Sequence, residues 1–85
     1  MITAPQAKVL LNHNPDLIPF ILGFQSHFEI AIDGESIAPQ RMTAPPQARQ
    51  FKTLTAAYSY LRTFLDYRGD VFIRLIEPHA GTGDT

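Results

Sequence analysis

The sequence contains no cysteine, which excludes disulfide bonds, thiolate zinc sites and cysteine nucleophiles. It also lacks a long apolar run. The longest one, residues 18–24, is interrupted by Pro19 and Gly23 and is far too short to cross a bilayer. No basic region precedes an apolar stretch near the N-terminus. We therefore expect no secretory signal, no membrane association and a cytoplasmic location.

Charged residues are few, at 18%, and they nearly cancel. The net charge of −1 excludes a protein held to nucleic acid or to an anionic membrane by bulk charge alone. The 85 residues are 45% hydrophobic, which allows folding but provides only one small core. We expect a single domain over residues 1–78 and a flexible, Gly-rich tail over residues 79–85.

The charges are unevenly distributed along the chain. Residues 1–40 hold one lysine against four acidic residues, whereas residues 41–76 hold six basic residues against two acidic ones. The first half is therefore acidic and the middle is basic. An ordinary hydrated surface explains such asymmetry in most proteins. The more specific interpretation is one face that meets phosphates or an acidic partner.

Secondary-structure signals in the first 24 residues are weak. Residues 4–11 fit either a short helix or the beginning of a strand. An Asn-Pro-Asp motif at residues 14–16 is typical of a helix start and predicts a helix over residues 15–22. Gly23 would end that helix, although Pro19 lacks the N–H group that the helix needs and would kink it.

The middle of the chain favours strands. Residues 25–33 alternate between apolar and polar side chains, with the two-residue period of a half-buried strand. The Asp-Gly pair at residues 33–34 favours a tight turn, after which residues 36–38 are expected to pair back briefly. Residues 39–48 are proline-rich and predict an exposed connection. Residues 49–53 predict a second main strand.

The clearest element is a helix over residues 54–67. Apolar side chains recur there at three- and four-residue spacing, and Thr53 or Thr55 is suited to cap its start. The members of this stripe are Leu54, Ala57, Tyr58, Leu61 and Leu65. Gly69 is expected to end the helix.

Residues 71–77 predict a last strand in which both faces are apolar. One face holds Val71, Ile73 and Leu75, and the other holds Phe72, Arg74 and Ile76. If the helix covers the first face, the second is too apolar to remain in water and needs another cover. Because a chain this short buries only about 60% of its unfolded surface, we predict a homodimer with Phe72 and Ile76 in its interface.

These elements together predict an α+β fold. A small, mostly antiparallel sheet of strands at about 25–33, 49–53 and 71–77 is expected, with one long helix packed on it. A short N-terminal helix is an open alternative.

No recognised catalytic motif is present: there is no Gly-rich phosphate loop, no Gly-x-Ser-x-Gly and no His-Glu-x-x-His. His27 and Glu29 lie on one strand face with Asp33 further along, in positions suited to a divalent metal or a shared proton. One histidine and scattered carboxylates fall short of the three or four ligands of a metal site. We interpret them as a hydrated strand face, and predict no enzymatic activity, no catalytic residue, no metal, no cofactor and no small-molecule substrate.

Basic residues and tyrosines interleave in the second half of the chain. The candidate binding residues are Arg49, Lys52, Arg62 and Arg74, and the interleaved aromatics are Tyr58, Tyr60 and Tyr67. Such combinations hold phosphates and stack on bases or on a protein partner. Under the alternative interpretation, Tyr58 is core, Tyr60 and Tyr67 are half-buried helix edges, and the basic residues keep the surface soluble.

The stretch Arg49-Gln-Phe-Lys-Thr-Leu-Thr-Ala-Ala-Tyr-Ser-Tyr-Leu-Arg62, followed by Val71-Phe-Ile-Arg-Leu75, resembles small proteins of bacterial plasmids and integrating elements. These include partition-associated proteins of the ParC type, which carry Arg-x-Phe-x-Thr-Leu-x-Ala-Ala, a Leu-Arg helix and a closing strand. The resemblance spans residues 49–75 only. It implies an accessory or regulatory protein of a mobile element without catalytic activity, and it transfers no site residues.

Two functions follow from the sequence. The first is a non-enzymatic homodimer of a mobile genetic element that binds DNA, or a DNA-bound protein, through the four candidate basic residues. The second is a protein–protein inhibitor or adaptor, such as an anti-defence protein of a phage or plasmid.

Overall fold

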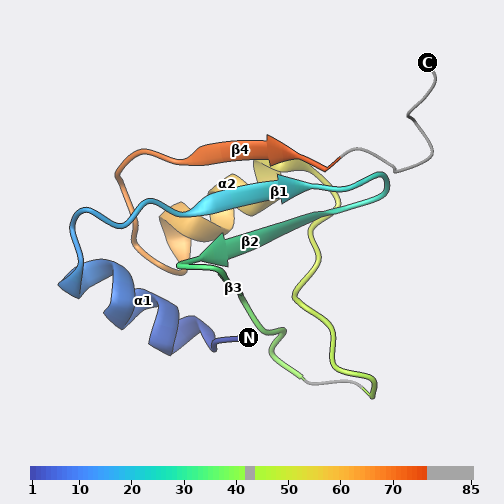
Figure 1. Ribbon diagram of the computed structural model, residues 1–85, viewed down its shortest axis with the longest axis horizontal. Helices are drawn as coiled ribbons and strands as arrows, with labels where there is room; N and C mark the ends of the chain where they lie inside the picture. Colours follow the sequence, from blue (N-terminus) through green and yellow to red (C-terminus); the bar gives the residue numbers. More distant parts are fainter. Residues whose placement is uncertain (42–43, 77–85) are drawn as a thin grey trace.

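A computed structural model describes residues 1–41 and 44–76 and shows an α+β domain with two helices and a four-stranded mixed sheet (Figure 1). In chain order the elements are α1 (Ala4–His13), β1 (Phe20–Gly23), β2 (Phe28–Ile32), β3 (Glu35–Ser36), α2 (Leu54–Thr63) and β4 (Phe72–Leu75). The sheet order is β3-β2-β1-β4. The flexible tail predicted for residues 79–85 lies outside the described residues.

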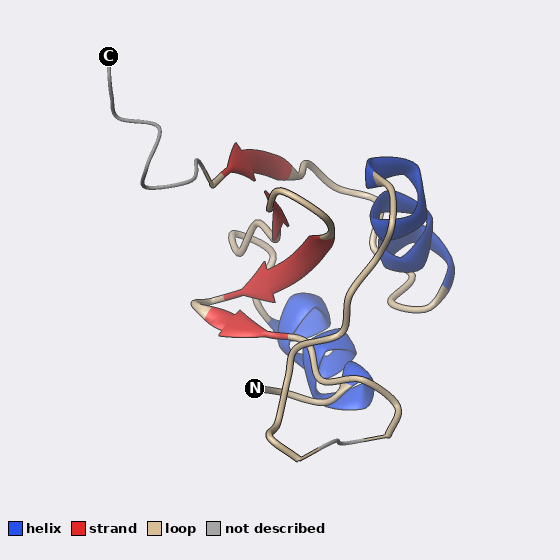
Figure 2. Ribbon diagram, turned by 90° about the vertical axis from the view of Figure 1, so that its right-hand side faces the viewer, coloured by secondary structure: helices blue, strands red, loops and turns tan. Residues whose placement is uncertain are grey.

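The sheet is mixed because β4 joins it parallel to β1. The pairings of β2 with β1 and with β3 are antiparallel, as expected, whereas β4 runs alongside β1 in the same direction. Helix α2 carries the chain across one face of the sheet, so that β4 enters beyond β1 at the far edge (Figure 1). Both helices lie on the same side of the sheet (Figure 2). Among the described elements, none covers the other side, which we call the open face.

Residues 4–11 adopt the helical alternative and form most of α1. The hydroxyl oxygen of Thr3 accepts from the backbone N–H of Gln6 at 3.2 Å, and the Gln6 side chain accepts from the backbone N–H of Thr3 at 2.9 Å. This reciprocal pair satisfies donors that the first helical turn leaves free. Ala7 and Leu11 then point into the core.

The helix predicted over residues 15–22 is wrong. Asn14 ends α1 instead of starting a second helix, and its side-chain amide donates to the carbonyl oxygen of Leu10 at 2.8 Å. Pro19 has no backbone N–H to donate within a helix. Strand β1 begins at the next residue, Phe20. The predicted helix stop, Gly23, is the last residue of that strand.

The prediction of a strand followed by a tight turn is confirmed. Ile30 and Ile32 of β2 are buried, and β2 begins at Phe28, three residues later than expected. Asp33 and Gly34 have φ angles of 54° and 80°, as in the turns that match the twist of a hairpin. The chain then pairs back as β3.

Residues 49–53 do not form the predicted second main strand. Only Phe51 pairs with the sheet, in an isolated antiparallel bridge to Phe28. Strand β3 and Ile37 already occupy the same edge of β2 from Ile30 onward, so this segment reaches only the first residue of β2.

Helix α2 begins at the predicted residue but ends before residue 67, and the face that it buries differs from the predicted one. The hydroxyl of Thr53 caps the first turn by accepting from the N–H of Ala56 at 3.0 Å. The helix ends at Thr63, and Asp66, with a φ of 52°, takes the left-handed conformation that Gly69 was expected to supply. Its buried residues are Ala57, Tyr60 and Leu61, followed by Leu65 beyond the helix end.

Two members of the predicted stripe therefore lie outside the core. Leu54 and Tyr58 are 36% and 40% exposed, whereas Tyr60 is only 8% exposed. The ring of Tyr60 packs against Phe51, with centroids 5.2 Å apart, and this contact turns Tyr60 rather than Tyr58 toward the sheet. The interpretation of Tyr58 as core and Tyr60 as a helix edge is thus reversed. Neither helix of the described chain is long and apolar enough to cross a membrane.

Candidate interaction surface

Strand β4 lies at one edge of the sheet, with β1 on its inner side and no described strand on its outer side. All four of its residues are exposed. In the parallel register Phe72 pairs with Phe20 and Ile73 with Ile21, and residues paired in this way share a face of the sheet. Ile21 is completely buried beneath the helices, so Ile73 lies on the helix side and Phe72 on the open face.

The open face carries a cluster of three apolar side chains, Phe20, Phe72 and Ile76, which we call the open-face cluster. The rings of Phe20 and Phe72 are in contact, with centroids 5.2 Å apart. Phe72 is 52% exposed, and the other two are 37% exposed. By the alternation of side chains along a strand, Phe72 and Ile76, the two residues of the predicted dimer interface, face the same side of the sheet. Sequence reasoning missed Phe20 because it placed that residue in a helix.

The other face of β4 is also uncovered, which corrects the expectation that the helix would shield it. Ile73 and Leu75 are both more than half exposed. Helix α2 packs against β1 and β2 and ends at Thr63, so it does not extend over the edge strand. Apolar residues on both faces of β4 therefore contact water.

The outer edge of β4 also has unpaired backbone groups. The N–H groups of Phe72 and Ile76 donate to carbonyl oxygens of the neighbouring β1 segment, at 3.0 and 2.7 Å. Successive N–H groups of a strand point to alternate sides, so those of Ile73 and Leu75 point away from β1. An exposed edge of this kind is a template for pairing with another strand.

The four candidate basic residues are not gathered on one face. Arg74 lies on the open face, beside Leu22 of β1. Arg62 lies on α2, on the other side of the sheet, where its guanidinium stacks over the ring of Tyr58 and donates to that hydroxyl. Lys52 is exposed just before α2. The set therefore does not make a single basic patch for phosphates.

Arg49, the remaining member of the set, is packed against aromatic rings. Its guanidinium carbon lies 4.9 Å from the ring centroid of Tyr60 and 5.6 Å from that of Phe51. Its Nε atom is buried and has no hydrogen-bond partner among the residues that the structure describes. It forms no ion pair with any residue in the described part of the chain.

Tyr67 is held in the loop between α2 and β4. Its hydroxyl donates to the carbonyl oxygen of Asp70 at 2.6 Å. Burial raises the pKa of Tyr67 above its usual value of 10.0, the negative charge of Asp70 raises it further, and the positive charge of Arg62 opposes the change. The neutral phenol is therefore the form that the fold favours.

His27 and Glu29 bond to each other, with 2.8 Å between Nε2 and Oε2. The imidazole also stacks on Phe24, with ring centroids 4.9 Å apart. Within residues 1–41 and 44–76, no three acidic or histidine side chains come close enough together to hold a metal ion. The described geometry thus provides a paired, half-buried couple rather than a ligand cage.

Comparison of the chain with protein-family models, with curated proteins and with solved structures gives no match.

Proposed function

We propose that this chain is a non-enzymatic binding protein that acts as a homodimer, with the open-face cluster and the outer edge of β4 as its self-association surface. The observation that supports this most is the edge strand itself, which has no described strand on its outer side and exposes apolar residues on both faces. Edge strands in monomers are usually short, charged or covered. Strand β4 is short, but it has only Arg74 as a charged residue.

A second copy of the chain fits this edge. A two-fold axis beside β4 makes the two edge strands antiparallel, so that the outward N–H and C=O groups of Ile73 and Leu75 in each copy meet their counterparts. The two open-face clusters then lie on one continuous sheet, where Phe72 of one copy lies opposite Ile76 of the other. Pairing would satisfy the outward backbone groups and would bury part of the flanks of the neighbouring apolar side chains.

We further propose that the dimer is an accessory protein of a mobile genetic element and contacts a DNA-bound protein. The resemblance over residues 49–75 supports the mobile-element context. The separation of Arg74 from Arg62 favours a protein partner over direct phosphate contacts, since duplex binding needs several cations on one face. An inhibitor or adaptor of another protein is the second candidate, and the same dispersed charge supports it.

Sedimentation velocity on the purified chain tests the dimer. We expect the mass of a dimer at micromolar concentration, and a monomer for Phe72→Glu, because that change puts a charge into the self-association surface. Val9→Glu is the matched control, since Val9 is 57% exposed on α1 and lies away from β4. Circular dichroism establishes that both variants are folded. A wild-type monomer up to near-millimolar concentration would contradict the proposal.

Fluorescence anisotropy with labelled duplex DNA, repeated across salt concentrations, separates the two kinds of partner. We expect binding no tighter than the weak affinity that any few basic residues provide. A tight complex whose affinity falls steeply with salt would show direct phosphate contacts and would overturn the protein-partner proposal.

A further inference from the structure

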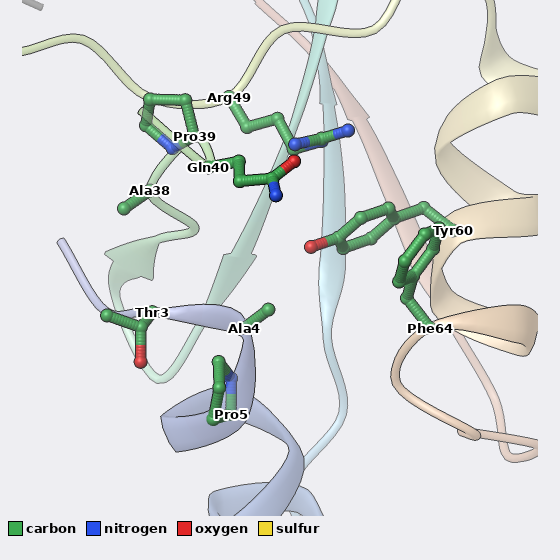
Figure 3. Close-up of a pocket in the computed structure, with 9 residues that line it drawn as sticks. All are labelled: Thr3, Ala4, Pro5, Ala38, Pro39, Gln40, Arg49, Tyr60 and Phe64. Carbon is green, nitrogen blue, oxygen red and sulfur yellow. The ribbon is translucent and has the colours of Figure 1, made fainter. Parts of the chain in front are cut away.

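A cavity of about 440 Å³ lies on the helix side of the molecule, between the first turn of α1 and α2 (Figure 3). Four segments that are far apart in the sequence line it: residues 3–5, residues 38–40, Arg49, and Tyr60 with Phe64. Its volume is in the range of small-molecule sites, which are mostly apolar with a few well-placed polar groups. From the sequence we expected no small-molecule substrate. No motif in the sequence indicates this cavity.

Aromatic and proline side chains form most of the cavity wall. The rings of Tyr60 and Phe64 stack with centroids 4.9 Å apart and an angle of 23° between their planes. Pro5 and Pro39 lie across the cavity from them (Figure 3). Flat walls of this kind favour a planar apolar group between them.

Two polar side chains that can donate hydrogen bonds reach the cavity. The Tyr60 hydroxyl and the Gln40 amide both point into the space between the helices (Figure 3). Although Tyr60 is only 8% exposed, its hydroxyl has no hydrogen bond to any residue that the structure describes. The hydroxyl is therefore available to donate to a ligand in the cavity.

The charge of the cavity favours the same kind of ligand. The guanidinium of Arg49 lies over the Tyr60 ring, and its Nε has no hydrogen-bond partner among the described residues. No aspartate or glutamate of residues 1–41 and 44–76 lines the cavity. The first turn of α1 adds the positive end of a helix dipole. The Thr3 hydroxyl oxygen accepts the cap bond of α1, and its O–H remains able to donate.

We propose that this cavity binds a carboxylate joined to an aromatic ring. The carboxylate accepts from the Arg49 guanidinium and the Tyr60 hydroxyl, and the ring packs against Phe64 and Pro39. Two molecules present this chemistry: a free aromatic acid, and the C-terminal phenylalanine of a peptide. The site is independent of the proposed self-association surface, because β1 and β2 lie between them.

Nuclear magnetic resonance titration of the full chain tests this proposal with four probes. These are 3-phenylpropanoate, the peptide N-acetyl-Gly-Gly-Phe with a free carboxylate, and the neutral amide of each. We expect saturable shifts at the backbone amides of residues 38–40 and Arg49. We also expect at least ten-fold weaker binding of the amide, or about 1.4 kcal/mol. The carboxylate that binds more tightly identifies the source. If neither binds saturably, or if the amides bind equally well, the proposal is overturned.

Substitutions test which positive charge binds the carboxylate. Arg49→Gln is expected to weaken carboxylate binding at least ten-fold, and Tyr60→Phe, which keeps the ring, to weaken it several-fold. Arg68→Gln is the matched control, because it removes the same charge from an exposed side chain outside the cavity. Equal weakening by Arg68→Gln would show that only the overall charge matters and would count against the site. The amide comparison on the wild-type chain decides the matter even where Arg49→Gln does not fold.

Discussion

Two leucines of α2 provide a direct test of which face of the helix is buried. Leu54 and Leu61 both belong to the apolar stripe that the spacing predicts. In the folded chain, however, Leu61 has no exposed surface and Leu54 is 36% exposed. Truncating each to alanine removes the same atoms from the same helix. The difference between the two variants therefore reports mainly how deeply each leucine is buried.

The structure predicts a large difference. Leu61 is part of the core cluster around Ile21 and Ile30, so Leu61→Ala removes its transfer free energy and also leaves a cavity. Such changes cost about 2–5 kcal/mol. Leu54 loses only part of its burial, and alanine is the better helix former, so Leu54→Ala should cost less than about 1 kcal/mol. The whole domain is stabilised by only about 5–15 kcal/mol, so Leu61→Ala removes a large share.

Urea unfolding followed by circular dichroism, at one fixed protein concentration, measures both costs. For a domain of this size, about 1 kcal/mol corresponds to about 4–8 °C in the melting temperature. We therefore expect Leu61→Ala to lower the melting temperature by more than about 10 °C. We expect Leu54→Ala to lower the melting temperature by less than about 5 °C. Equal losses, with unchanged denaturant slopes, would refute the observed orientation of α2.

Three smaller predictions concern caps and loops. Thr53→Ala should destabilise the protein by about 1 kcal/mol in urea unfolding through loss of the α2 cap, whereas Thr55→Ala, one residue into the helix, should have little effect. Gly69→Ala places a Cβ atom 2.5 Å from the Tyr67 hydroxyl oxygen, so it should lower the melting temperature, and Tyr67→Phe in the same chain should restore part of the loss. Because the pKa of Tyr67 is raised on folding, the native state keeps this proton longer than the unfolded chain. The resulting stabilisation is complete below about pH 10 and is lost as the pH rises through the raised pKa. Urea unfolding from pH 8 to 11 should show this decline, and a decline of the same size in Tyr67→Phe would contradict it.

Elements with local signals were predicted well from the sequence. Alternation set the position of β2, and the Asp33-Gly34 pair set its turn, because both depend on neighbouring residues only. The start of α2 was also local, since the Thr53 side chain bonds a backbone group three residues away. The parallel placement of β4 could not be predicted from local signals, because it depends on how far α2 carries the chain across the sheet.

Errors arose where tertiary contacts decide between local alternatives. Asn14 suits either end of a helix, and the folded chain uses it at the end of α1. Tyr58 and Tyr60 are both compatible with a helical stripe, and the contact of Tyr60 with Phe51, a residue outside the helix, determines which is buried. The cavity could not be predicted from the sequence for the same reason. Arg49 and the start of α1 line it together only in the folded domain.

The two proposed surfaces make different demands on the same small core. Self-association uses the open face and the edge of β4, where the apolar side chains are exposed in the single chain. The cavity uses the helix side, where Tyr60 contributes its ring to the core and its hydroxyl to the empty space. Ligand binding would therefore stabilise α2 against the first turn of α1 without touching β4. A carboxylate that raises the melting temperature but leaves the dimer dissociation constant unchanged is the expected result. A change in both would show that the two sides of the sheet are coupled.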